Sequence, residues 1–190
     1  GNGVFIDFLI ERLKLNKVSK IFISLHYKSE LFIEHLNEMN YGIDIVPIIE
    51  PKPLGTGGAI SFVLQNTEIH SPFFVINGDT ISNIVLEKMY HKFKNSHLNA
   101  MIGLSFIKNA SRYGTIKEKN NTIYSFSEKS NSGQGWINNG YYIFKKELFQ
   151  NQIGKFSLEL DLFPKIIRES ELGSFKVDND RFLDMGTPSD

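Results

Sequence analysis

The apolar run at residues 72–76, followed directly by Asn77-Gly78-Asp79, constrains the fold of this chain more than any other stretch. Consecutive apolar residues without alternation are typical of a strand that is buried on both faces. Gly78 permits a sharp turn and leaves Asp79 at the carboxyl end of this strand, the edge at which open α/β sheets bind ligands. Asp79 is therefore a candidate to hold a cation, and the alternatives are a helix N-cap or an ordinary turn aspartate.

Helical and extended patterns alternate along the first half of the chain, which predicts βαβ units and a parallel sheet. The second half adds runs typical of antiparallel strands. We therefore expect one α/β domain over residues 1–190, with a Rossmann-like, three-layer, mixed and mostly parallel sheet. The expected helices cover residues 4–15, 30–39, 60–64, 84–93 and 158–167, and the expected strands cover 21–25, 43–49, 73–76, 99–106, 113–117, 122–126, 136–144, 175–177 and 181–183.

The composition excludes several classes of protein. The 190 residues are 41% hydrophobic, which is enough for one substantial core. Twenty-one basic and 21 acidic side chains balance, so no overall field attracts nucleic acid or a membrane surface. Cysteine is absent, which excludes disulfides and cysteine chemistry. With no transmembrane or signal-peptide pattern, we expect a soluble, cytoplasmic protein.

A glycine-rich segment, Gly55-Thr56-Gly57-Gly58, lies just before the helical pattern at residues 60–64. Glycines let a backbone approach a ligand closely, and a helix N-terminus offers free N–H groups to phosphate or other acceptors. The segment is not a Walker A loop, because no Gly-Lys-Ser/Thr follows it. A plain strand-to-helix turn explains it as well.

Two further places put charged side chains at strand ends. Glu128 and Lys129 follow the strand expected at 122–126, and the alternative is a solvated surface pair. Asp184 follows a short apolar run and precedes Gly186, as Asp79 follows its own strand. Two carboxylates of this kind, together with substrate phosphate, are how proteins usually hold Mg²⁺.

A set of short motifs in one order resembles the sugar-1-phosphate nucleotidyltransferase family, and the resemblance runs over essentially the whole chain. Within that family the sequence is most similar to the D-glycero-D-manno-heptose 1-phosphate guanylyltransferases of bacterial surface-polysaccharide synthesis. The motifs are LGTGGA at 54–59, NGD at 77–79, YG at 113–114, EK at 128–129, NNGY at 138–141, SLE at 157–159 and DMGTP at 184–188.

The resemblance implies a role for each matching position. The glycine-rich segment would lie against the base and ribose, Glu50 would read the base edge, and two aspartates would bind Mg²⁺. Other residues would contact the sugar hydroxyls, the sugar ring and the 1-phosphate. In these terms the nucleotide residues are Glu50, Gly55, Thr56, Gly57 and Gly58; the metal ligands are Asp79 and Asp184; the sugar residues are Gly114, Glu128, Asn138 and Gly140; and the residue at the 1-phosphate is Lys129.

Glu50 closes the strand expected at 43–49, and its carboxylate suits guanine, which presents two adjacent donors. The alternative is a solvated strand-end residue. The family's phosphate loop, with its arginine, its lysine in a Pro-Lys-Pro segment and its first strand, would all precede Gly1. We therefore expect the sequence to be an excerpt of a longer chain, and the alternative is a truncated, inactive form.

The leading hypothesis is an enzyme that transfers a nucleotidyl group from a nucleoside triphosphate, GTP by the matching above, to a sugar 1-phosphate with release of pyrophosphate. Uridylyl, cytidylyl or thymidylyl transfer to another sugar, a binding module without turnover, and a structural interaction domain are the alternatives. The expected partners are these two substrates and Mg²⁺, with no nucleic acid and no membrane, and a homo-oligomer is left open.

Overall fold

The computed structural model describes residues 4–111, 113–127, 133–178 and 181–186. The chain divides into two compact units, of which unit 1 comprises Gly1–Ile69 and Glu147–Asp161 and unit 2 comprises His70–Lys146 and Leu162–Asp190. The single domain expected over residues 1–190 stays a prediction. Among the described residues, no helix is both long enough and apolar enough to cross a membrane.

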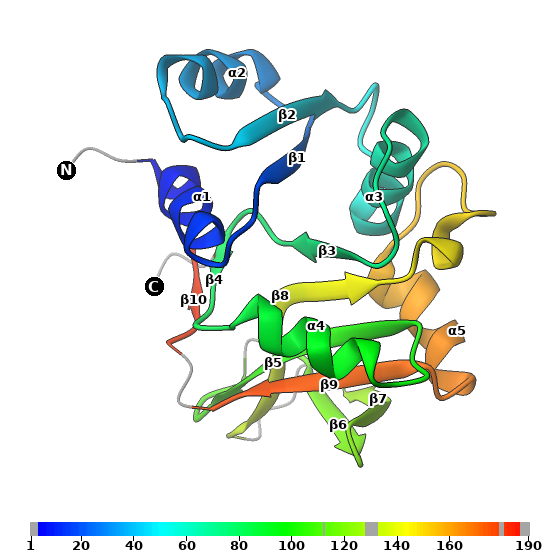
Figure 1. The fold of residues 1–190 in the computed structure, drawn as a ribbon. Coiled ribbons are helices and arrows are strands. Elements are labelled where there is room, and N and C mark those ends of the chain that lie inside the picture. Colours follow the sequence, from blue (N-terminus) through cyan, green and yellow to red (C-terminus); the bar gives the residue numbers. More distant parts are fainter. Residues whose placement is uncertain (1–3, 112, 128–132, 179–180, 187–190) are drawn as a thin grey trace. The chain divides into compact units, whose positions relative to one another are not determined.

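Unit 1 is built on two parallel strands, β1 (Lys20–Leu25) and β2 (Asp44–Ile49), which pair from Lys20 opposite Asp44 to Leu25 opposite Ile49. Three helices accompany them: α1 (Phe5–Leu15), α2 (Ser29–Glu38) and α3 (Gly55–Asn66) (Figure 1). The buried side chains of α1 recur at helical spacing, as the sequence pattern predicts. The second part of the unit carries the short helices η1 (Lys146–Phe149) and η2 (Leu158–Leu162).

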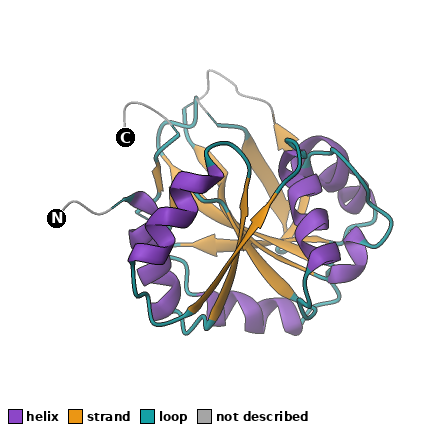
Figure 2. Ribbon diagram, turned by 90° about the horizontal axis from the view of Figure 1, so that it is seen from above, coloured by secondary structure: helices purple, strands orange, loops and turns teal. Residues whose placement is uncertain are grey.

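Unit 2 contains a six-stranded sheet in the order β3-β8-β5-β9-β7-β6. Helix α4 packs on β5, β8 and β9, and α5 packs on β7 and β9. Figure 2 colours the helices and the strands of the described residues separately. The elements are β3 (Phe73–Ile76), β4 (Thr80–Ile81), α4 (Leu86–Lys94), β5 (Ala100–Ile107), β6 (Thr115–Lys119), β7 (Thr122–Ser127), β8 (Gly135–Phe144), α5 (Phe163–Arg168), β9 (Leu172–Val177) and β10 (Leu183–Asp184).

The expected mixed α/β class is confirmed, and three details differ. Within the described residues only β1–β2 and β5–β9 pair in parallel, so the antiparallel share is larger than predicted. The strand expected at 73–76 is β3, but it is not buried on both faces as predicted, because only Phe73 of its four residues is buried. The long helix expected at 158–167 is a π-helix, η2, followed by α5.

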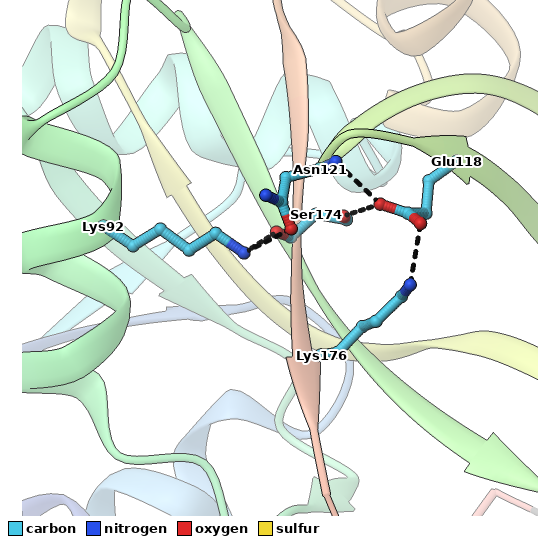
Figure 3. Close-up of polar contacts among 5 residues, drawn as sticks. All are labelled: Lys92, Glu118, Asn121, Ser174 and Lys176. Carbon is cyan, nitrogen blue, oxygen red and sulfur yellow. Dashed lines mark hydrogen bonds and ion pairs between the residues drawn. The ribbon is translucent and has the colours of Figure 1, made fainter.

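A polar cluster joins the β6–β7 hairpin to β9 and α4 (Figure 3). The Glu118 carboxylate accepts hydrogen bonds from Lys176 Nζ at 2.7 Å, Ser174 Oγ at 3.0 Å and Asn121 N at 2.9 Å. Lys92 Nζ donates to Asn121 Oδ1 and to the Ser174 carbonyl, both at 2.9 Å. Burial by itself would raise the pKa of Glu118, but the hydrogen bonds from Lys176 and Ser174 and the charge of Lys176 hold that pKa below its usual value.

We expect Glu118→Gln to destabilise the fold at pH 7 by about 1–3 kcal/mol, because a neutral amide replaces a partly buried carboxylate that holds the charged Lys176 Nζ. Since the folded-state pKa of Glu118 is lowered, its stabilising contribution is present above the ordinary value of 4.5 and is lost as the pH falls through the folded-state pKa. The difference in melting temperature between wild type and variant should therefore be largest at neutral pH. Glu87→Gln, at an exposed position of α4, is the control, and a gap that stays constant into acid would contradict this reading.

Candidate functional site

The structure brings Asp79 and Asp184 together within unit 2. Asp79 immediately precedes β4, and Asp184 lies in β10, which pairs antiparallel with β4 and places Asp184 opposite Thr80. The Met185 amide donates to the Asp79 carbonyl at 2.9 Å, which ties the two turns to each other. The sequence placed Asp184 after its strand, whereas it is the last residue of the strand; the short antiparallel pair is what aligns the two aspartates.

The carboxylates of Asp79 and Asp184 both lie beside Gly186. A Cβ on Gly186 would lie 3.1 Å from Asp184 Oδ1 and 3.5 Å from Asp79 Oδ2, so both side chains face the same small space. The Gly186 amide donates to Asp184 Oδ1 at 2.9 Å and helps to orient that carboxylate. Hard carboxylate oxygens facing one space fit a divalent cation that also binds phosphate. Among the described residues there is no group of three or more His, Cys, Asp or Glu suited to a metal ion, so phosphate and water would supply the remaining ligands.

Asn138 and Gly140 lie beside the residues that lead to Asp79. The Gly140 carbonyl accepts from the Asn77 amide at 2.8 Å, and Asn138 Oδ1 accepts from the Gly140 amide at 3.0 Å. Gly140 has a φ of +79°, and a Cβ there would lie 2.5 Å from Thr80 Oγ1 and 3.0 Å from Asn77. The glycine is therefore required by the protein's own packing, and the room it was expected to leave for a sugar ring is taken on that side by Asn77 and Thr80. Direct contacts of Asn138 and Gly140 with a sugar stay predictions.

The segment that carries Gly114 is adjacent to the strand that carries Asp184. The Tyr113 ring packs edge-on against Phe182, with the ring centroids 5.8 Å apart. Gly114 itself is exposed. Glu128 and Lys129, the remaining residues expected at the sugar phosphate, lie outside the described residues. Unit 2 thus places Gly114, Asn138 and Gly140 on segments that contact those of Asp79 and Asp184.

The glycine-rich segment is the first turn of α3, and its amides are only partly free. Gly57 and Gly58 are buried, and their N–H groups donate to the Phe156 carbonyl at 3.1 and 3.2 Å. The expectation of free N–H groups is therefore wrong for these two residues. Gly55 and Thr56 are exposed and remain open to a nucleotide. No sequence signal near residue 57 identifies Phe156 as its partner, because the two are far apart along the chain.

Glu50 lies in unit 1, at the carboxyl end of β2, as the sequence predicts. Its Oε1 accepts from Ser24 Oγ at 2.8 Å and its Oε2 accepts from the Leu54 amide at 3.1 Å. The side chain is half-buried and has both partners within the protein. Each carboxylate oxygen has a second lone pair for a ligand donor, so base recognition by Glu50 stays a prediction. Ser24 is a partner that sequence reasoning missed.

These two groups of residues lie in a chain of a known family. A family model described as "Nucleotidyl transferase" matches residues 1–190, and the chain belongs to this family. The family resemblance drawn from the ordered motifs is thereby confirmed.

Individual relatives show which enzymes of this family the chain is similar to. A D-glycero-alpha-D-manno-heptose 1-phosphate guanylyltransferase from Aneurinibacillus thermoaerophilus is 30% identical over 191 residues, which cover 100% of this chain and 82% of that protein. An enzyme of the same name from Campylobacter jejuni is 30% identical over 187 residues, covering 98% of this chain and 82% of that protein. The crystal structure of HddC from Yersinia pseudotuberculosis complexed with GMP-PN has 33% sequence identity and a TM-score of 0.86, over 97% of this chain and 80% of that one.

Proposed function

We propose that this protein transfers a guanylyl group from GTP to a sugar 1-phosphate, with D-glycero-D-manno-heptose 1-phosphate as the substrate. A phosphate oxygen of the sugar 1-phosphate attacks the α-phosphorus of GTP. The bond from the α-phosphorus to the oxygen that bridges it to the β-phosphate breaks, and pyrophosphate leaves. No covalent enzyme intermediate is needed, because in-line positioning of the two substrates and neutralisation of their charge suffice.

The observation that carries this proposal is the pair of carboxylates around Gly186 in a chain of the nucleotidyl transferase family. Asp79 and Asp184 would hold Mg²⁺, which when bound neutralises charge on the substrate phosphates. The exposed turn residues Gly55 and Thr56 would contact the nucleotide, while Gly114, Asn138 and Gly140 would contact the sugar. The similarity to two heptose 1-phosphate guanylyltransferases supports guanine as the base and heptose as the sugar.

The direct test is pyrophosphate release by the full-length protein supplied with GTP, the heptose 1-phosphate and Mg²⁺. We expect release that requires all three, and formation of a GDP-sugar in equal amount. Nucleotide binding without any release would favour the alternative, a binding module without turnover. Efficient release with UTP, CTP or dTTP in place of GTP would support nucleotidyl transfer and refute guanine as the base.

Lys129 provides a test of the sugar-phosphate assignment, which rests on the family resemblance. We expect Lys129→Ala to raise the KM for the sugar 1-phosphate about tenfold to a hundredfold, the factor that corresponds to one charge-assisted hydrogen bond. The KM for GTP should change little. Steady-state kinetics with each substrate varied in turn measure both values, and Lys88→Ala, at an exposed position of α4, is the control. Loss of nucleotide binding with an unchanged sugar KM would reverse the assignment.

A further inference from the structure

A short segment of unit 1, residues 154–159, packs on the first turn of α3. We call residues 154–159 the brace and residues 54–58 the glycine turn. The Phe156 carbonyl accepts from both the Gly57 and Gly58 amides, and the Phe156 amide donates to the Leu54 carbonyl at 3.0 Å. The two segments are therefore joined by backbone hydrogen bonds in both directions.

Side chains add a second connection between the brace and the glycine turn. Thr56 Oγ1 accepts from the Leu158 amide at 2.9 Å and donates to Glu159 Oε2 at 3.1 Å. Ser157 Oγ donates to the same carboxylate oxygen at 2.9 Å. The Glu159 carboxylate thus holds the Thr56 hydroxyl in one orientation, although both side chains are exposed.

The glycines of the turn fit the brace closely. A Cβ on Gly55 would lie 2.7 Å from the Phe156 carbonyl oxygen, and Gly55 has a φ of +74°. A Cβ on Gly57 would overlap the Phe156 ring, and one on Gly58 would overlap the Gly154 carbonyl oxygen. On the side that faces the brace, the missing side chains therefore make room for the protein and not for a ligand.

We propose that the brace fixes the glycine turn for GTP, with Phe156 and Glu159 as positioning residues. A turn with three glycines has high conformational freedom, and ordering it on binding would subtract from nucleotide affinity. The brace orders the turn beforehand, so its loss weakens nucleotide binding and leaves the chemical step unchanged. This inference rests on the proposed function, because it takes the glycine turn as part of the GTP site.

The first experiment measures GTP binding by calorimetry and turnover by pyrophosphate release, both on the full-length protein. Glu159→Ala is expected to raise the GTP dissociation constant about fivefold, the factor that corresponds to one hydrogen bond. The kcat at saturating GTP and the KM for the sugar 1-phosphate should not change. Glu159→Gln keeps an oxygen that accepts from Thr56 and Ser157, so it should bind GTP as the wild type does. Glu34→Ala, at an exposed position of α2, is the control.

A second experiment separates bracing from a direct clash with the nucleotide. Gly57→Ala places a methyl group against the Phe156 ring and is expected to weaken GTP binding. Adding Phe156→Ala removes the ring and keeps the backbone carbonyl, so the double variant should bind GTP more tightly than Gly57→Ala alone. A methyl group that blocked GTP directly would not be relieved in this way, and absence of relief overturns the proposal.

Binding and turnover together distinguish the two proposals. A wild type that binds GTP but releases no pyrophosphate would refute the proposed function. The GTP affinities of the variants would still test whether the brace orders the glycine turn. Unchanged GTP affinity in both Glu159→Ala and Gly57→Ala would refute the brace whatever the turnover. If Glu159→Gln bound GTP as weakly as Glu159→Ala, Glu159 would act through its charge and not through its hydrogen bonds. That result would also overturn the inference. A wild type that does not bind GTP would overturn both.

Discussion

Asp79→Asn and Asp184→Asn are each expected to lower Mg²⁺-dependent guanylyl transfer by about a hundredfold or more, because each removes a negative charge from the proposed cation site. The fold should persist. In Asp184→Asn the amide oxygen can still accept from the Gly186 amide, and the contact from the Met185 amide goes to the main chain of residue 79. Pyrophosphate release over a Mg²⁺ titration measures the loss of activity, and thermal melts test the fold.

Metal binding itself gives a second readout for the same two variants. Mn²⁺ is a suitable probe, because its electron paramagnetic resonance signal falls when the ion is bound, and affinity in the presence of GTP should drop in both variants. Asp44→Asn is the matched control, since Asp44 is an exposed aspartate in a surface ion pair with Lys20. Near-normal activity and Mn²⁺ affinity in both Asp79→Asn and Asp184→Asn would show that the two-carboxylate site is wrong.

Local patterns predicted the elements whose burial follows one periodicity. The apolar residues of α1 recur at helical spacing, and its predicted bounds of 4–15 differ by one residue from Phe5–Leu15. The strand expected at 43–49 is β2, Asp44–Ile49. In both cases the signal lies within the segment itself, so no information about distant partners is needed.

Pairing direction and burial depend on partners that a local pattern does not contain. The run in β3 is apolar throughout, yet only Phe73 is fully buried. Its partner is β8, which lies antiparallel and pairs with it through Tyr141 to Phe144, far along the chain from β3. An apolar run indicates that a strand is buried. It does not indicate which strand pairs with it, whether the pairing is parallel or antiparallel, or how many faces are buried.

In the candidate site, too, features with a local sequence pattern could be predicted and contacts between distant residues could not. Asp79 and Asp184 could be chosen from sequence because an acid after a short apolar run, followed by a turn, is a local pattern. The hydrogen bonds between the glycine turn and the brace could not be predicted from sequence, because Thr56 and Glu159 are 103 positions apart. Gly186 could have been found from its place two residues after Asp184, whereas the role of Ser24 as a partner of Glu50 is visible only once β1 and β2 are paired.

Wild-type protein is expected to prefer GTP over UTP, CTP and dTTP, and Glu50→Gln is expected to lose about tenfold or more of that preference. Guanine presents N1–H and an exocyclic amine side by side, and a carboxylate accepts both. Uracil and thymine offer one donor between two carbonyl oxygens, which an ionised acid repels. A glutamine presents a donor beside its acceptor, so it no longer favours guanine, and a contact of this charged kind is worth about 1.5–3 kcal/mol.

The structure makes Glu50→Gln an informative substitution, because it can keep both contacts of Glu50 within the protein. The amide oxygen can accept from the Leu54 amide, and the amide nitrogen can donate to the Ser24 hydroxyl, which serves as donor or acceptor. The glycine turn should therefore stay in place, and a competition series among the four nucleotides would report on base recognition. Glu50→Ala, which loses both contacts, should instead weaken binding of every nucleotide. If Glu50→Gln kept the full preference for GTP while Glu50→Ala bound all nucleotides poorly, Glu50 would be an anchor of the turn, and another residue would read the base.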